Sequence, residues 1–273
     1  MNIESISILG GAGRDGTPEP VSRLDLRMGD VASVVGPTGS GKTALINDIG
    51  LFADRDTPSG RRILINGDMP PEAFLDTPAS NPIALITQHT TFLSDLPVRR
   101  FLEIHARSRG NTAADGVVQK TLAFANQLTG EPLIVDSAMT ELSGGQTRAL
   151  LIADAVVIGN APIILLDEIE NAGIDRSRAL ELLHAYEKIF IFVTHDPRIA
   201  LLSDYRVVMA GGSMQDLLMT SPDEQRLAKR IGYVDDMLLG LRERIRTGGR
   251  LSEDDFQLDL AADVVTTSGE NVA

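Results

Sequence analysis

Eight residues from Gly36 to Thr43, GPTGSGKT, have the types and spacing that hold phosphate groups. They match the pattern G-x-x-x-x-G-K-[ST] directly after an apolar run and directly before a helical one. The glycines let backbone N–H groups close around phosphate oxygens, and the start of a helix favours an anion. We expect Lys42 to reach the β- and γ-phosphates and Thr43 to ligate Mg²⁺. A glycine turn with a chance lysine would not need this context, so the stretch predicts nucleoside triphosphate binding by Gly36, Pro37, Thr38, Gly39, Ser40, Gly41, Lys42 and Thr43.

Two carboxylates follow a second apolar run, in the stretch IILLDE. Asp167 comes directly after the run 163–166 and suits a role at Mg²⁺, while Glu168 suits activation of an attacking water. A solvated acidic strand end would have the same composition. The presence of the phosphate-binding stretch in the same chain favours the catalytic interpretation.

Two further polar residues end predicted strands. Gln88 follows PIALIT, and His195 follows KIFIFVT. Parallel strands bring their carboxyl ends to one edge of a sheet, where active residues gather. We therefore expect His195 to contact the γ-phosphate and orient the water, and Gln88 to contact Mg²⁺ and the water. For His195 alone, a plain turn from strand to helix before Asp196 and Pro197 is the alternative.

A second helix start able to bind an anion lies about a hundred residues later, at LSGGQ (142–146), before the apolar run ALLIADAVVIG. The phosphate-binding stretch 36–43 (the P-loop), Gln88, this LSGGQ, IILLDE and His195 follow one another in this order. With these motifs the chain resembles the ATP-binding cassette (ABC) ATPases over about residues 1–215. That resemblance implies ATP hydrolysis with Mg²⁺ in a head-to-tail dimer, in which the LSGGQ loop of one cassette caps the ATP held by the other. The residues implied to act on the partner's ATP are Ser143, Gly144, Gly145 and Gln146.

The sequence departs from the family pattern at several points. Residues 1–51 contain no Phe, Tyr, Trp or His to stack on adenine, and we hypothesise that Arg14 in GGAGRDG lies over the base instead. The same stretch fits G-x-G-x-x-G, but the following TPEP forbids the helix that a dinucleotide site needs. After Glu168 the family commonly has proline and a short loop ending in aspartate. Here Ile169 replaces the proline and Asp175 comes one residue later than expected, and we expect Asp175 to lie in the loop that crosses to the partner cassette. Asp154 occupies a position that is typically arginine.

Alternating strands and helices predict an α/β fold with a parallel core sheet, preceded by antiparallel strands near the N-terminus. The resemblance implies a P-loop cassette over 1–220, with a helical subdomain at about 92–140 carrying two expected helices, 98–109 and 115–128. Residues 221–273 form a predicted extension, with an amphipathic helix, an acidic segment and a disordered tail. The apolar stripe of that helix is Leu227, Ile231, Val234, Leu238, Leu241 and Ile245.

The composition limits the classes of partner and the cellular location that we expect. The net charge of −13 argues against a nucleic-acid partner, and the absence of cysteine excludes disulfides and thiolate-bound metals. No run reaches the length of a membrane span, and MNIESISILGG lacks the basic start of a secretory signal. We therefore expect a cytoplasmic protein, possible also at the inner face of a membrane.

Two functions fit these observations. In the first, the chain is the energising subunit of a transporter, and separate membrane permease subunits dock on residues 92–140. In the second, it is a soluble ABC ATPase that remodels or activates a cytosolic protein partner. The interval of 54 residues between Gln88 and Leu142 leaves room for a compact block and excludes a long coiled-coil insertion. Cargo and direction of transport are not encoded in these motifs.

Overall fold

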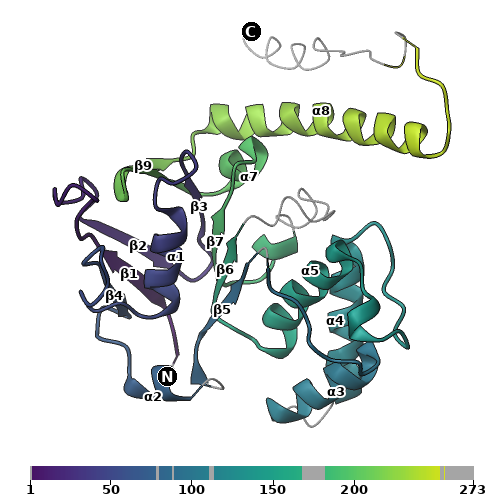
Figure 1. Cartoon of the computed structure of the whole chain (residues 1–273), viewed down its shortest axis with the longest axis horizontal. Helices are drawn as coiled ribbons and strands as arrows, with labels where there is room; N and C mark the ends of the chain where they lie inside the picture. Colours follow the sequence, from purple (N-terminus) through teal and green to yellow (C-terminus); the bar gives the residue numbers. More distant parts are fainter. Residues whose placement is uncertain are drawn as a thin grey trace, which may run out of the picture.

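The computed structural model describes residues 2–77, 80–87, 89–110, 114–167, 182–252 and 255. Figure 1 shows two sheets, helix α1 beside them and a separate block of helices. The strands are β1 (Ser5–Leu9), β2 (Arg23–Arg27), β3 (Val31–Val35), β4 (Arg62–Ile65), β5 (Ile83–Ile86), β6 (Ile163–Asp167), β7 (Ile189–Val193), β8 (Tyr205–Ala210) and β9 (Ser213–Met219). The helices are α1 (Lys42–Gly50), α2 (Glu72–Asp76), α3 (Val98–Ser108), α4 (Ala114–Leu128), α5 (Gly144–Ala153), α7 (Pro197–Leu202) and α8 (Pro222–Arg246).

The larger sheet has the strand order β5-β6-β7-β3-β8-β9. Neighbouring strands from β5 to β8 run parallel, and β9 returns antiparallel to β8. Its central strands read as unbroken apolar runs because helices and the second sheet cover both faces; all of β7, IFIFV, is buried. The predicted parallel core sheet is confirmed, and its carboxyl ends meet at one edge.

The smaller sheet, β2-β1-β4, is antiparallel, which confirms the predicted N-terminal strands. Alternation of polar and apolar residues puts one face of it inward: in β2, RLDLR, only the two leucines are buried. The buried side of α1 joins this face to the larger sheet in one core. The members that carry this contact include Ile6, Ile8, Leu24, Leu26, Leu45, Ile46, Ile49 and Val34. The P-loop helix is therefore fixed from two sides.

The helical block has a core of its own. On α3 the buried residues Val98, Leu102 and Ala106 recur at the spacing of one helix face, and they share a cluster with residues of α4 and α5. Both helices predicted between 98 and 128 are confirmed, with α3 ending one residue earlier than expected. The helical block lies beside edge strand β5 of the larger sheet (Figure 1).

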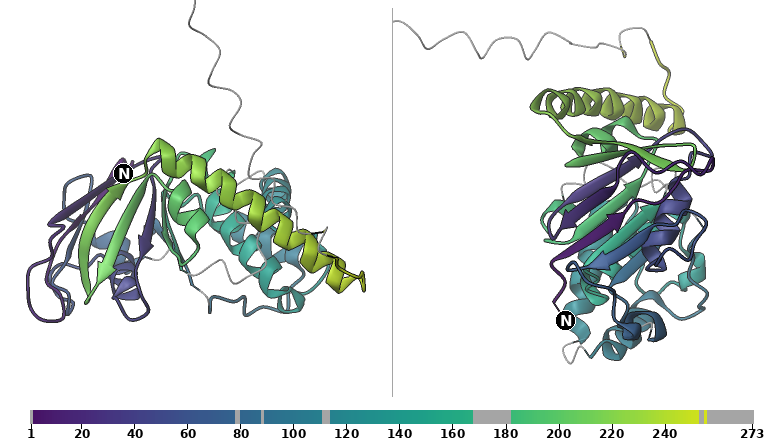
Figure 2. Two further views of the ribbon diagram at one scale, coloured as in Figure 1. Left: turned by 90° about the horizontal axis from the view of Figure 1, so that it is seen from above. Right: turned by 90° about the vertical axis from the view of Figure 1, so that its left-hand side faces the viewer.

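Helix α8 lies across the top of the molecule, above the carboxyl edge of the larger sheet (Figures 1 and 2). It packs on α7, and its buried Gly232 leaves room for the guanidinium of Arg198. The predicted apolar stripe is only partly covered, since Leu227 and Ile245 are 48% and 61% exposed. The predicted helix is confirmed, and its contact with α7 leaves part of the apolar stripe exposed. The acidic segment and tail that follow lie almost wholly outside the described residues.

A buried lysine precedes β7 and makes stability depend on pH. Lys188 is 7% exposed, and its Nζ donates to Asn160 Oδ1 (2.8 Å) and to the carbonyl of Ala161 (3.0 Å). Burial lowers the pKa of Lys188 from 10.5 to about 8. The unfolded chain therefore binds more protons between these values, so Lys188 contributes stability that rises with pH there.

We expect the free energy of unfolding of the natural protein, relative to Lys188→Met, to rise by up to roughly 3 kcal/mol between about pH 8 and 10.5. Urea unfolding at several pH values measures this difference. A difference between the two proteins that does not change over the range would contradict it.

Candidate functional site

Three neighbouring strands of the larger sheet end at predicted site residues. β6 ends at Asp167, β7 is followed by Thr194 and His195, and β3 is followed by Gly36. Val193 pairs with Asp167 on one side and with Val34 on the other, so the three ends lie level. The structure thus brings Asp167, His195 and the P-loop together. Gln88, Glu168 and Asp175 lie outside the described residues.

The P-loop follows a backbone path that only glycine allows at its close approaches. Gly36 and Gly41 have φ values of 152° and 103°. A Cβ on Gly36 would lie 2.3 Å from the carbonyl oxygen of Met209, and one on Gly41 would lie 2.8 Å from the Cα of Gly212. The turn between β8 and β9 therefore forms a wall of the loop.

Lys42 lies inside this loop. It is 7% exposed, and its Nζ donates to the carbonyl oxygens of Gly36 (2.8 Å) and Pro37 (3.2 Å). The ammonium of Lys42 and the first amides of α1 therefore offer positive charge to an anion. Pro37, Thr38 and Gly39 are exposed around it. This set of groups fits a chain of phosphates.

Oxygen donors suited to Mg²⁺ lie at the same edge. Thr43 is exposed in the first turn of α1, and Asp167 is half-buried at the end of β6. Hydroxyl and carboxylate oxygens, together with phosphate oxygens and water, are the ligands that Mg²⁺ takes. The residues present therefore fit the metal that the motif implies.

His195 is held by the start of the next helix. Asp196 caps α7, where its Oδ1 accepts from the backbone N–H of Arg198 (2.7 Å) and Ile199 (3.3 Å), and Pro197 takes the first helical position. His195 itself is exposed and lines a cavity of about 330 Å³ together with Gly36. The cap fixes the backbone next to His195, which lines the same cavity as Gly36 of the P-loop.

The LSGGQ stretch forms the start of α5, in the helical block. Ser143 is the N-cap: its Oγ accepts from Gln146 N (3.3 Å), and Gln146 Oε1 accepts from Ser143 N (3.0 Å). Ser143 and Gly144 are exposed, so the amides of this helix start face outward. Figure 1 shows that α5 and α1 belong to separate parts of the molecule. The start of α5 is therefore capped by its own side chains and exposed to solvent.

Asp154, where the sequence departs from the usual arginine, has a partner. It begins a π-helical turn (Asp154–Ile158) that continues α5, and its Oδ1 lies 2.8 Å from Nδ1 of His105 on α3. The pair joins two helices of the helical block.

Two groups beside the P-loop were not predicted. The turn that leads into β9 places Gly212 against Ser40 and Gly41, and the buried Arg61 also contacts Gly212. The glycine pair 211–212 between VVMA and SMQDLL is a signal for a two-residue hairpin, and it would have revealed β9. No local signal distinguishes the buried Arg61 from its half-buried neighbour Arg62.

Comparison with known proteins also indicates an ABC-type ATP-binding protein. A family model described as ABC transporter matches residues 21–171. An uncharacterized ABC transporter ATP-binding protein of Methanocaldococcus jannaschii is 47% identical over 258 residues, covering 94% of this chain and 98% of its own. The spermidine/putrescine import ATP-binding protein PotA of Trichodesmium erythraeum is 26% identical, over 91% of this chain and 66% of its own.

Solved structures share the fold. An ATP-binding cassette in a dimeric post-hydrolysis state with ADP and phosphate has a TM-score of 0.59 at 20% identity, over 79% of this chain and 99% of that one. The cbiO1 protein of Clostridium perfringens has a TM-score of 0.60 at 21% identity, over 89% and 97%. The predicted cassette fold is confirmed. With the family model, the close relative and the P-loop in agreement, this chain belongs to the ABC transporter family and is an ABC-type ATPase.

Proposed function

We propose that this chain is the energising subunit of a membrane transporter and hydrolyses ATP with Mg²⁺ in a head-to-tail homodimer. The observation that carries the proposal is the pair of helix starts able to bind phosphate, at Lys42 and at Ser143, which lie on separate blocks of one cassette. The helix start at Lys42 of one chain and the helix start at Ser143 of a second chain can then bind the same nucleotide.

Each site residue has a role in this proposal. Lys42 and the P-loop amides hold the phosphates, while Thr43, Gln88 and Asp167 organise Mg²⁺, which would neutralise phosphate charge when bound. Glu168 polarises the attacking water, and His195 contacts the γ-phosphate. The capped position of His195 beside Gly36 supports its part.

The partner chain completes the site with Ser143, Gly144, Gly145 and Gln146, and Asp175 lies in the loop that crosses to it. The exposure of Ser143 and Gly144 at the start of α5 supports contact with a second chain. A fold neighbour described as a dimeric cassette with ADP and phosphate is consistent with this arrangement.

The helical subdomain is the proposed docking surface for permease subunits. It exposes large apolar residues to solvent: Leu93, Leu96, Ile104 and Ile134, of which Leu93 is 96% exposed. No helix in the described part of the chain is long and apolar enough to span a membrane. A transporter role therefore needs a membrane partner, and we place the chain on the cytoplasmic side of it. The relatives are named as transporter ATP-binding proteins, which favours this role over the soluble remodelling alternative.

Purification of tagged Glu168→Gln chain from its native cell tests the transporter role. This variant lacks the carboxylate that polarises water, so it is expected to stay in the ATP-bound, closed state. Mass spectrometry of co-purifying proteins, with and without detergent, should recover a polytopic membrane protein in stoichiometric amount with detergent. Recovery of a soluble partner in that amount, with nothing from the membrane, would contradict the role.

Arg14 is the proposed contact for the nucleotide base. Its backbone N–H donates to Gly211 O (2.9 Å), its side chain packs on Gly212, and it is exposed beside the turn that walls the P-loop. We expect Arg14→Ala to raise the KM for ATP about fivefold with little change in kcat, because a cation over an aromatic face is worth about 1 kcal/mol. Steady-state phosphate release measures both constants. An unchanged KM would remove Arg14 from the site.

A further inference from the structure

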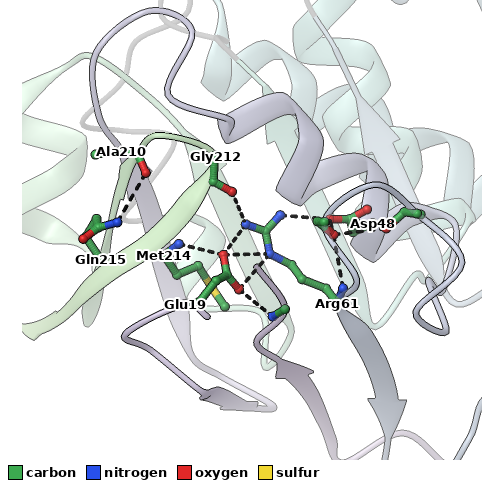
Figure 3. Close-up of polar contacts among 10 residues, drawn as sticks. Glu19, Asp48, Arg61, Ala210, Gly212, Met214 and Gln215 are labelled. Atoms are coloured by element: carbon green, nitrogen blue, oxygen red, sulfur yellow. Dashed lines mark hydrogen bonds and ion pairs between the residues drawn. The ribbon is translucent and has the colours of Figure 1, made fainter. Parts of the chain in front are cut away.

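The side chain of Arg61 is fully buried among Glu19, Asp48 and Gly212 (Figure 3). Arg61 Nε donates to both carboxylate oxygens of Glu19 (3.2 and 3.1 Å), and Nη2 donates to Glu19 Oε1 (2.5 Å). On its other side, Nη1 donates to Asp48 Oδ2 (2.9 Å), and Nη2 also donates to the carbonyl oxygen of Gly212 (2.8 Å). One planar group thus holds three separate segments of the chain.

The two carboxylates are buried as deeply and are tied down in turn. Glu19 is 6% exposed and accepts from the backbone N–H of Gly11 (3.0 Å) and of Met214 (2.7 Å). Asp48 is 4% exposed and accepts from Ser59 Oγ (2.8 Å). Every partner of the guanidinium is therefore fixed by groups of its own.

Arg61 keeps its charge despite burial. Burial opposes the charge on Arg61, but hydrogen bonding and attraction from Glu19 and then Asp48 outweigh it and raise the pKa of Arg61 above its usual value. A buried ion cluster is often no more stabilising than apolar residues of the same size would be. The cluster instead fixes the relative positions of its partners, because the planar guanidinium sets the direction of each hydrogen bond.

One side of this cluster contacts the P-loop, and the other lies on the helix that follows it. Gly212 donates from its backbone N–H to Ser40 O (2.8 Å), and it packs on Gly41 so closely that a Cβ there would lie 2.8 Å from its Cα. Asp48 lies on α1, the helix whose first residue is Lys42. Arg61 therefore joins the wall of the P-loop to the helix that carries its lysine and its amides.

We propose that Arg61 is a positioning residue for phosphate binding: with Glu19 and Asp48 it fixes α1 against the β8–β9 turn and so sets the P-loop before a nucleotide binds. This inference rests on the proposed nucleotide site. Arg61 does not touch the phosphates; it lowers the cost of ordering the amides that do.

Arg61→Lys is the informative change. An ammonium on a flexible stem keeps the charge but cannot reach Glu19, Asp48 and Gly212 in one geometry. We expect about tenfold weaker binding of ATP and, equally, of inorganic tripolyphosphate, because a loosened P-loop must be ordered on binding. The equal loss follows from an effect on the phosphate site alone.

Titration calorimetry of the full chain at 25 °C, with circular dichroism to verify folding, measures both affinities. Arg62→Lys is the matched control, since the neighbouring Arg62 pairs on the surface with Asp54 at 2.5 Å; it should bind both ligands as the natural protein does. Affinities of folded Arg61→Lys within about twofold of this control would overturn the inference, as would a loss confined to ATP.

A second variant covers a failure of Arg61→Lys to fold. Asp48→Asn keeps an acceptor for Nη1 and removes one charge, and we expect both ligands to bind about threefold more weakly. Unchanged binding there would overturn the inference. If the natural protein itself binds neither ATP nor tripolyphosphate, the proposed nucleotide site fails, which is a different result.

Discussion

Replacing Lys42 with alanine is expected to weaken ATP binding by about a hundredfold or more and to abolish hydrolysis, because charge-assisted hydrogen bonds contribute about 1.5–3 kcal/mol each. The ammonium is 7% exposed and donates to two carbonyl oxygens of its own loop. Its loss therefore removes the proposed contact to the β- and γ-phosphates and also an internal support of the P-loop. Equilibrium binding of ATP and phosphate release measure the two effects.

Lys120→Ala is the matched control for this change. Lys120 is exposed on α4, so its replacement changes the net charge equally but leaves the P-loop intact. It should bind and hydrolyse ATP as the natural protein does. Binding of ATP by Lys42→Ala within about threefold of this control would contradict the assignment of the phosphate site.

Ser143→Asp is expected to leave ATP binding to the isolated chain unchanged but to lower hydrolysis by about a hundredfold, because like charges placed together in a site repel strongly. Aspartate caps a helix as well as serine does, so α5 should keep its start. The new carboxylate would stand at the exposed position that, in the proposed dimer, faces the partner's γ-phosphate.

Ser143→Asn separates charge from structure. Asparagine also caps a helix and carries no charge, so this control should keep most of the activity. Size-exclusion chromatography in the Glu168→Gln background, with and without ATP, should show a dimer for Ser143→Asn and a monomer for Ser143→Asp. An ATP-dependent dimer of Ser143→Asp would argue against contact between Ser143 and a partner's nucleotide.

Much of the fold could be predicted because its elements follow local patterns. The apolar strands β3, β6 and β7 are buried on both faces and so read as continuous runs, and the parallel order then put Asp167, His195 and Gly36 at one edge. The capping box at Ser143 and Gln146 is visible in LSGGQ itself, and it defines where α5 begins.

What could not be predicted depends on contacts between distant parts of the chain. Arg61 and Glu19 are 42 residues apart, and Met214 reaches the same carboxylate from 195 residues away. The full burial of Arg61 beside a half-buried Arg62 does not follow from the sequence of RRILI, because alternation on a short strand fixes faces but not partners. Strand β9 is a different case: the glycine pair 211–212 is a local signal for it, although its second half, DLLM, lacks a clean alternation.

Mixing two inactive variants tests the head-to-tail site most directly. In a mixed dimer of Lys42→Ala with Ser143→Asp, both changes fall in one composite site, and the other site keeps an intact Lys42 and an intact Ser143. Equal mixing should restore about a quarter of the natural activity per chain if the chains pair at random, and up to about half if only mixed dimers form, because each mixed dimer has one intact site of two. If each chain used its own Ser143, no mixture would recover activity, and that result would contradict the account.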